Sequence, residues 1–483
     1  MCSIIVVCEK SSIDDVYVML NKLNHRGPDS YGVYYNGDIY HNTPLNDVKS
    51  SSNQDNNDII LAHNLLSIVG DNEMQPLVSS NFVLVANAQL YNYKELIEKY
   101  HIIDLNTNSD CEVILKVIEH FYHGNLKEAV RKAAGEFDGD YAFCVYDDKN
   151  YMIVRDRMGV KPVYYTNNNG KFISASEIKA FADKSNINSL NPRCAIYNGD
   201  IIRISDDYVR CERLDEVDEI KAKLKDALIN SVYKRTRNLD HLALLFSAGV
   251  DSTIIAVILK QLEVDFTAYT IGTPNSQDLD FAKKVASDID INLKYNIISQ
   301  ADVEEYFQPT LNAIEDDNLM KLGVGMAINM ASNLAALDGN KVILSGQGAD
   351  ELFAGYNRYK NKIDTPQKLL EELTHDLNNM YHVNLERDDK ATMTNSIELR
   401  VPFLDKNVVD IACQIPLKYL IDSPEDNIRK HILRDVASQL NVPDYIAYRP
   451  KKAAQYGTGI DKIIRKKLLK QDKYQNILKN SRN

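Results

Sequence analysis

Buried strands that alternate with helices in the second half of the chain constrain its fold more than any other feature. The continuous apolar runs HLALLF (241–246), FTAYTIG (266–272) and KVILSG (341–346) are separated by segments with helical periodicity, the first of which precedes them at 217–236. Continuously apolar strands are typical of parallel sheets that are covered by helices. The pattern predicts an α/β parallel-sheet domain with a helical part beyond residue 365, and such sheets bind ligands outside the carboxyl ends of their strands.

Residues 3 to about 180 follow a different pattern. Short alternating or apolar runs, such as IILAHNLLSIV (59–69) and FVLVANAQLY (82–91), are separated by Asn, Gly and Asp. This pattern predicts an α+β layered domain of antiparallel sheets with helices on their faces. The polar stretch 43–58 is predicted to be a surface loop. Helices are expected at 13–24, 93–100, 110–121 and 125–133.

Length and composition limit the arrangement further. A chain of 483 residues exceeds one ordinary core, so we expect two large domains, 2–210 and 215–470, followed by a polar tail at 471–483. The net charge of −12 argues against a nucleic-acid partner. No apolar run reaches the roughly 18 residues that cross a bilayer, and the N-terminus lacks a signal-peptide pattern, so we expect a cytoplasmic protein without a membrane partner.

The seven cysteines form no CxxC pair, which argues against a zinc site or a disulfide framework. Cys2 is a special case, because removal of the initiator Met would make it the N-terminal residue. A thiol beside a free α-amine is the arrangement of N-terminal nucleophiles.

The turn SAGVDS (247–252) lies between the strand HLALLF and the next helical segment. Small residues at a helix N-terminus expose backbone N–H groups that suit a phosphate, and Asp251 adds a carboxylate for Mg²⁺. A Walker loop is absent. Taken alone, the residues also fit a plain tight turn.

A second small-residue turn, SGQGADELFAGY (345–356), follows the strand KVILSG and supplies Asp350 and Glu351. Two such turns on parallel strands place carboxylates around one Mg²⁺-bound polyphosphate. The alternative is two unrelated turns.

These motifs resemble known families. SAGVDS resembles the SGGxDS pyrophosphate loop of N-type ATP pyrophosphatases, and SGQGADELFAGY with ELRVPFLD (398–405) resembles glutamine-hydrolysing asparagine synthetases. The first half resembles a class II glutamine amidotransferase domain, and the likeness extends to about residue 460. Its motifs, in matching order, are MCSI, HRGPDSYG, LAHNLLSIVG, NAQLYNYKEL, NSDCEVIL, DRMGVKPVYY and ASEIKAF.

The resemblance implies a glutaminase half and a synthetase half. ATP would adenylate a carboxylate, aspartate by default, and nitrogen from glutamine or ammonia would then form the amide, leaving AMP and pyrophosphate. The cofactors implied are ATP and Mg²⁺, and a homodimer is possible. By the same resemblance the catalytic residues are Cys2, Asn87 and Lys451, with Lys452 as the alternative to Lys451 by one position.

The resemblance also assigns the binding residues. Glutamine would be bound by Asn87, Ala88, Gln89 and Asp110, the metal by Asp251 and Asp350, and the acceptor by Lys321 and Gln347. The nucleotide would be bound by Ser247, Ala248, Gly249, Val250, Asp251, Ser252, Ile271, Gly272, Gly346 and Gln347.

Several positions depart from the family in ways that affect substrate binding. Leu65 replaces the arginine that holds the α-carboxylate of glutamine, and Gln89 replaces the acidic residue that faces its amine. Arg26 is the alternative ligand for the carboxylate. Gln347 replaces a glutamate beside the acceptor, and either Gly323 or Lys321 stands where the family has an arginine. Lysine holds a carboxylate as a point charge and not bidentately.

These departures leave two alternatives to an asparagine synthetase. One is a related amide-forming synthetase that acts on another carboxylate, as β-lactam synthetases do. The other, from a different class, is a non-catalytic nucleotide-binding regulatory relative.

Overall fold

The computed structural model describes residues 2–8, 12–51, 59–68, 74–168, 171–274, 276–450 and 457–480. They form two compact units that divide between Asp206 and Asp207. In this described part of the chain, no helix is long and apolar enough to cross a membrane.

Two antiparallel sheets build the first unit. The first has the order β11-β9-β10-β1-β4-β2-β3, with β1 (Ser3–Cys8), β2 (Ser30–Tyr35), β3 (Asp38–His41), β4 (Ile59–Leu65), β9 (Tyr164–Asn168), β10 (Lys171–Ala175) and β11 (Asn188–Ser189). The second has the order β13-β12-β8-β7-β6-β5, with β5 (Leu77–Val78), β6 (Val83–Leu90), β7 (Gly139–Tyr146), β8 (Tyr151–Arg155), β12 (Cys194–Tyr197) and β13 (Asp200–Arg203).

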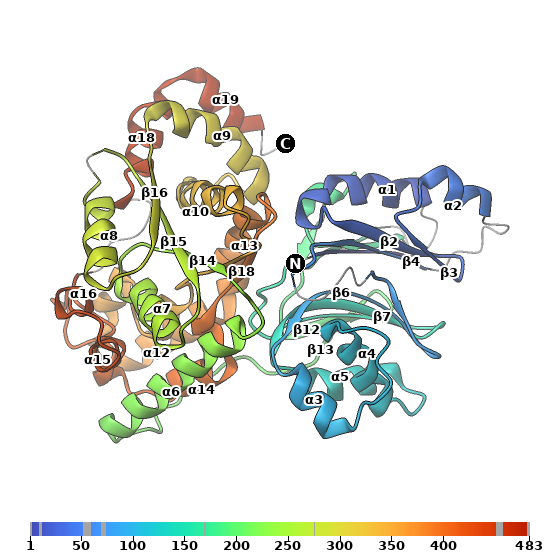
Figure 1. The fold of residues 1–483 in the computed structure, drawn as a ribbon, viewed down its shortest axis with the longest axis horizontal. Helices are drawn as coiled ribbons and strands as arrows, with labels where there is room; N and C mark the ends of the chain where they lie inside the picture. Colours follow the sequence, from blue (N-terminus) through green and yellow to red (C-terminus); the bar gives the residue numbers. More distant parts are fainter. Residues whose placement is uncertain are drawn as a thin grey trace. The chain divides into compact units, whose positions relative to one another are not determined.

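Helices cover the outer faces of these two sheets (Figure 1). The helices α1 (Ile13–Lys22) and α2 (Leu45–Ser51) lie on the first sheet, and α3 (Tyr93–Tyr100), α4 (Asp110–Phe121) and α5 (Leu126–Glu136) lie on the second. One apolar core lies between the sheets, where Ile4 and Val6 of β1 pack with Val83 and Val85 of β6. This four-layer arrangement confirms the predicted α+β domain of antiparallel sheets.

The prediction of a surface loop at 43–58 is wrong for its first half. Helix α2 occupies Leu45–Ser51, and Val48 is fully buried in the core beneath α1. Leu45 packs against the same core, and the two residues lie on one helix face at a spacing of three. Two apolar side chains were therefore enough to anchor a mostly polar segment; residues 52–58 lie outside the described part.

A parallel sheet with the order β16-β15-β14-β17-β18 forms the centre of the second unit and confirms the predicted α/β domain. Its strands are β14 (Leu242–Leu245), β15 (Phe266–Gly272), β16 (Leu293–Ile297), β17 (Val342–Leu344) and β18 (Glu398–Arg400). The chain runs outward from β14 to β15 and β16, and then returns to β17 on the other side of β14. Such a reversal opens a crevice at the carboxyl ends of the two strands where the direction changes.

Helices flank this sheet and make up most of the C-terminal part (Figure 1). They include α6 (Val217–Thr236), α7 (Val250–Gln261), α8 (Gln277–Asp288), α9 (Gln300–Ile314), α10 (Leu319–Leu337), α11 (Ala349–Leu352), α12 (Pro366–Met380), α13 (Glu386–Met393), α14 (Lys406–Ala412), α15 (His431–Gln439), α16 (Asp444–Ala447), α18 (Ile460–Lys466) and α19 (Asp472–Asn480). The tail is anchored, because Tyr474 of α19 is buried and its ring centroid lies 5.0 Å from that of Phe307.

Candidate active sites

The interior between the two sheets of the first unit contains polar residues at one end of its apolar core. Residues two apart on a strand point to the same face, so Asn87 shares the inner face of β6 with Val85. By the same rule Cys2 shares the inner face of β1 with Ile4, which lies opposite His63 of β4 in the register. Three strands therefore bring Cys2, His63 and Asn87 to one inner region.

Cys2 and Asn87 are joined directly. The backbone N–H of Cys2 donates to Oδ1 of Asn87 at 3.0 Å, and Asn87 is fully buried. Its Nδ2 group has no hydrogen-bond partner among the described residues. A buried amide donor without a partner is costly, and an acceptor oxygen on a ligand would satisfy it.

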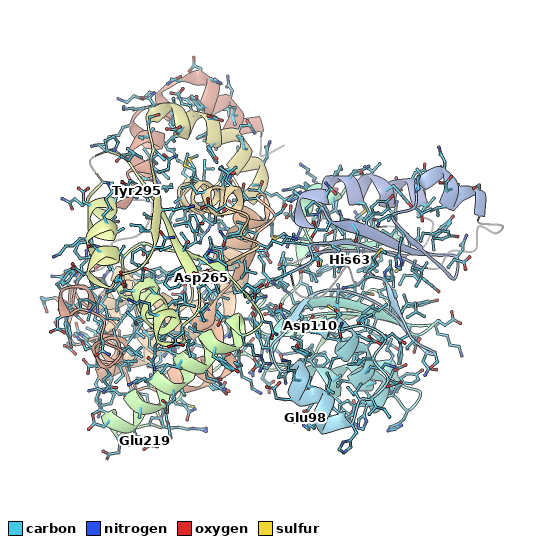
Figure 2. All side chains as sticks on the ribbon, in the orientation of Figure 1. His63, Glu98, Asp110, Glu219, Asp265 and Tyr295 are labelled. Carbon is cyan, nitrogen blue, oxygen red and sulfur yellow. The ribbon has the colours of Figure 1, made fainter. Side chains whose placement is uncertain are left out.

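His63 is a polar residue of this interior that the sequence analysis did not single out. Its Nε2 lies 3.1 Å from the carbonyl oxygen of Ala86, which precedes Asn87, and Figure 2 marks its position within the first unit. Burial, together with the positive charge of the N-terminus, lowers the pKa of His63 to about 3. The imidazole is therefore neutral near pH 7. The available signal was a histidine inside the apolar strand segment IILAHNLL.

Gln89 and Asp110, both assigned to glutamine binding, contact each other. Gln89 Nε2 donates to Asp110 Oδ2 at 3.0 Å, and the backbone N–H of Leu90 donates to the same oxygen. Asp110 Oδ2 therefore accepts two hydrogen bonds from within the protein. The Ala88 methyl group points away from Asn87, to the outer face of β6, where it packs on the core covered by α3, α4 and α5.

Arg26 is fully buried and already has anionic and carbonyl partners. Its Nη1 lies 2.7 Å from Glu177 Oε1, and its Nε donates to the Cys2 carbonyl oxygen at 3.3 Å. Burial alone would raise the pKa of Glu177, but the charges of Lys179, His25 and Arg26 hold it well below its ordinary value. Arg26 therefore supports Cys2 and pairs with Glu177, which argues against the alternative that it replaces the arginine missing at Leu65.

In the second unit, the two small-residue turns lie side by side. They follow β14 and β17, which are adjacent parallel strands. At Gly346, an added Cβ would lie 3.0 Å from Cβ of Asp251, so glycine lets the second turn approach the first. Within the first turn, Ser247 Oγ and Ser252 Oγ lie 3.3 Å apart, and Ala248 adopts the left-handed φ of 53° that favours glycine.

Lys430 links the two carboxylates that the sequence analysis assigned to a metal. Its Nζ lies 2.8 Å from both oxygens of Asp251 and 2.7 Å from Oδ1 of Asp350, and its side chain is 1% exposed. Burial lowers the pKa of Lys430, while the charge of Asp251 acts in the opposite direction. Two carboxylates that converge on one cation also fit the oxygen ligands that Mg²⁺ requires.

The remaining assigned residues are distributed as follows. Ile271 and Gly272 end β15, next to β14, and the Ile271 side chain is buried in the apolar core. The Gln347 N–H donates to Ser345 Oγ at 3.3 Å. Lys321 pairs with Asp316 at 2.7 Å and donates to the His382 carbonyl oxygen at 3.1 Å, so its ammonium group is already engaged. Lys451 and Lys452 lie outside the described residues.

Comparison with known proteins agrees with both units. Residues 1–198 match the glutamine amidotransferase domain family, and residues 223–367 and 361–475 match the asparagine synthase family. A Methanocaldococcus jannaschii protein, provisionally named glutamine-hydrolysing asparagine synthetase 1, is 40% identical over 95% of this chain and 93% of its own length. The Escherichia coli asparagine synthetase B is 28% identical over 90% of this chain and 78% of its own length.

An amidotransferase unit followed by a synthase unit of this kind defines an ATP-dependent carbon–nitrogen ligase. Given the 40% identity to a relative along nearly its whole length, the chain belongs to the family of glutamine-hydrolysing asparagine synthetases. The family resemblance, enzyme class and ATP dependence predicted from the sequence are thereby confirmed.

The buried imidazole of His63 predicts a pH-dependent stability. Because its pKa is 6.5 in the unfolded chain and about 3 in the folded one, the unfolded state alone takes up a proton below pH 6.5. As the pH is lowered from 6.5 to 3, the free energy of unfolding should then fall by about 1.4 kcal/mol per pH unit. His63→Gln keeps an N–H donor for the Ala86 carbonyl oxygen and should remove this contribution.

Urea unfolding of both proteins between pH 4.5 and 7.5, followed by circular dichroism, measures the difference. The comparison must be differential, because burial raises the pKa of Asp156 in the same unit to about 6 and so raises stability as the pH falls. If the free energy of unfolding changes with pH equally in wild type and variant, the pKa of His63 is the same in the folded and unfolded states, and the prediction is wrong.

Proposed function

We propose that this protein makes asparagine. The second unit activates aspartate with ATP, and the first unit supplies nitrogen from glutamine, with free ammonia as the alternative source. The main support is the convergence of Asp251 and Asp350 on one cation. Both follow the carboxyl ends of β14 and β17, the adjacent parallel strands between which the strand order changes direction. The two functional domains are residues 2–210 and 215–470.

In the proposed synthetase reaction, a carboxylate oxygen of aspartate attacks the α-phosphorus of ATP, and pyrophosphate leaves with the electron pair of the broken P–O bond. The turn of Ser247, Gly249 and Ser252 binds the phosphates through backbone N–H and hydroxyl groups. The adenine lies against Ile271 and Gly272, and Lys451 stabilises the charge on the adenylate. Mg²⁺, held by Asp251 and Asp350, would neutralise phosphate charge.

Ammonia then attacks the acyl carbon, and AMP leaves. To supply this ammonia, the α-amine of Cys2 takes up the thiol proton and the sulfur attacks the amide carbon of glutamine. The amine then returns the proton to the leaving nitrogen as the C–N bond breaks, which releases ammonia and leaves a thioester for water to hydrolyse. Nδ2 of Asn87, buried and without a partner among the described residues, donates to the oxyanion of the tetrahedral intermediate. Water releases glutamate in a second step.

One observation favours a second candidate, a synthetase that acts on a different carboxylate. Gln347 is neutral, and the ammonium group of Lys321 is already paired with Asp316, so both residues assigned to the acceptor lack a free charge for aspartate. A regulatory, non-catalytic relative would form no pyrophosphate, so a pyrophosphate assay separates it from both enzymes.

Asp251→Asn should reduce AMP formation by at least 100-fold, because an amide does not neutralise or orient a metal-bound polyphosphate. The assay follows AMP and pyrophosphate with ATP, Mg²⁺, aspartate and ammonium. Asp265→Asn is the matched control, since Asp265 is exposed and directly precedes β15, at the amino ends of the parallel strands and not at their carboxyl ends. Figure 2 labels this residue. A fully active Asp251→Asn variant, or ADP as the product, would remove the basis of the synthetase mechanism.

Gln347→Glu should raise kcat/KM for aspartate by about 10-fold or more, because a carboxylate beside the acceptor would bind its ammonium group through a charge-assisted bond. Gln347→Met controls for the loss of the amide without adding charge. Pyrophosphate release at varied aspartate gives the constants. If aspartate stimulates release with neither wild type nor Gln347→Glu, the acceptor is another carboxylate and the second candidate replaces the first.

Glutamine should bind weakly, and ammonium should support synthesis more readily than glutamine. Leu65 offers no cation for the α-carboxylate, and Gln89 presents an amide donor toward the α-ammonium side. Loss of two charge-assisted bonds weakens binding by roughly 100-fold to 10,000-fold. Glutamate release at varied glutamine measures this, with Cys2→Ala as the blank. If glutamate release saturates at micromolar glutamine, and Cys2→Ala abolishes that release, the glutamine pocket is intact and this prediction is wrong.

A further inference from the structure

Lys430 reaches the two carboxylates from an unusual backbone conformation. Arg429 and Lys430 have φ angles of 56° and 57°, so two successive non-glycine residues lie in the left-handed region. This region is sparsely populated by residues with a side chain, and it persists only where surrounding contacts hold it. Some other part of the molecule must therefore fix this turn.

The Lys430 side chain also has little lateral freedom. At Gly355, an added Cβ would lie 2.3 Å from Cε of Lys430 and 1.9 Å from Oδ1 of Asp350. The lysine therefore passes directly over the Gly355 backbone on its way to the carboxylates. A displaced turn would not let the same ammonium group reach both acids along this path.

Arg434 lies in α15, four residues after Lys430. Its side chain holds the left-handed turn of Arg429 and Lys430 in place. Its side chain is buried, and its Nε and Nη2 donate to the carbonyl oxygens of Arg429 and Ile428 at 2.5 and 2.6 Å. Asp426 completes the clamp, because its Oδ1 accepts the backbone N–H groups of Ile428 and Arg429 at 2.8 and 3.0 Å.

The same guanidinium group also fixes a second stretch of backbone. Its Nη1 donates to the carbonyl oxygens of Ala447 and Arg449, the latter at 3.0 Å. Arg449 in turn pairs with Asp278 of α8 at 2.9 Å. The Arg434 guanidinium thus connects the left-handed turn before α15 to the end of α16 and the residues after it. Arg449 then connects those residues to α8.

We propose that Arg434 is a positioning residue of the synthetase site, which holds the left-handed turn so that Lys430 bridges Asp251 and Asp350. Its effect on catalysis rests on the proposed function, whereas its effect on Lys430 does not. Arginine suits this role because its planar fork of donors can bind several carbonyl oxygens in fixed directions, which an ammonium group cannot do.

Chemical labelling of lysines in the full-length protein tests the positioning directly. Limited acetylation with acetic anhydride, quantified for each lysine by mass spectrometry, should find Lys430 protected in the wild type. Arg434→Met should raise its labelling rate at least 10-fold, and Arg434→Lys should raise it less. Arg235→Met is the matched control: Arg235 is equally buried, its partner Asp405 keeps Lys234, and Lys430 should stay protected.

Kinetics give the second measurement. The kcat for AMP formation should fall at least 10-fold in Arg434→Met while KM for ATP changes less than 3-fold, because the phosphate-binding turn after β14 keeps its geometry. Lys430 that stays protected in a folded Arg434→Met protein overturns the proposal. If that variant does not fold, Arg434→Lys is judged by the same criterion. A wild type that forms no AMP would refute the proposed function and leave the labelling result valid.

Discussion

Two carboxylates in the helices that follow adjacent parallel strands share one buried lysine, and the proposed nucleotide site of the second unit depends on this contact. Without a cation between them, the carboxylates of Asp251 and Asp350 would repel each other. Lys430 removes that repulsion and keeps both acids directed at one point before any ligand binds. The glycine at 346 and the order of the parallel strands bring the turns together, and Lys430 places one positive charge between the two carboxylates.

The first unit places polar groups inside a core in a comparable way. Arg26 and Glu177 are both fully buried, and burying one without the other would leave an uncompensated charge. Their pairing supports the Cys2 carbonyl oxygen, while Asn87 receives the Cys2 N–H from the facing sheet. The backbone of Cys2 is thus held by Arg26, in the short 3-10 helix Asn24–Arg26, and by Asn87 of β6.

Much of this fold follows from the sequence because its periodicities are strong. Helices α3 and α4 have the predicted bounds, and the apolar runs at 242–245 and 342–344 form the predicted parallel strands. Helix α2 was missed because only Leu45 and Val48 bury it in a polar segment. Lys430 and Arg434 were missed because each gains its role from long-range contacts: Lys430 meets Asp251, which lies 179 positions away in the chain. No local pattern distinguishes such a lysine from one exposed to solvent.

The altered positions and the retained ones belong to different parts of the chemistry. In the proposed mechanism, phosphate binding and oxyanion stabilisation use backbone N–H groups, glycine geometry and an amide. The turns after β14 and β17 and Asn87 have these groups. Recognition of an amino acid uses formal charges, and these are replaced at Leu65, Gln89 and Gln347. At one of these positions the structure has an internal contact instead, because the Gln89 amide donates to Asp110 Oδ2. A charge lost from a substrate pocket weakens ground-state binding first, whereas the geometry that stabilises a transition state can persist without it. Under the proposed function, the sequence changes therefore act on substrate binding and leave the groups that carry out the reaction unchanged.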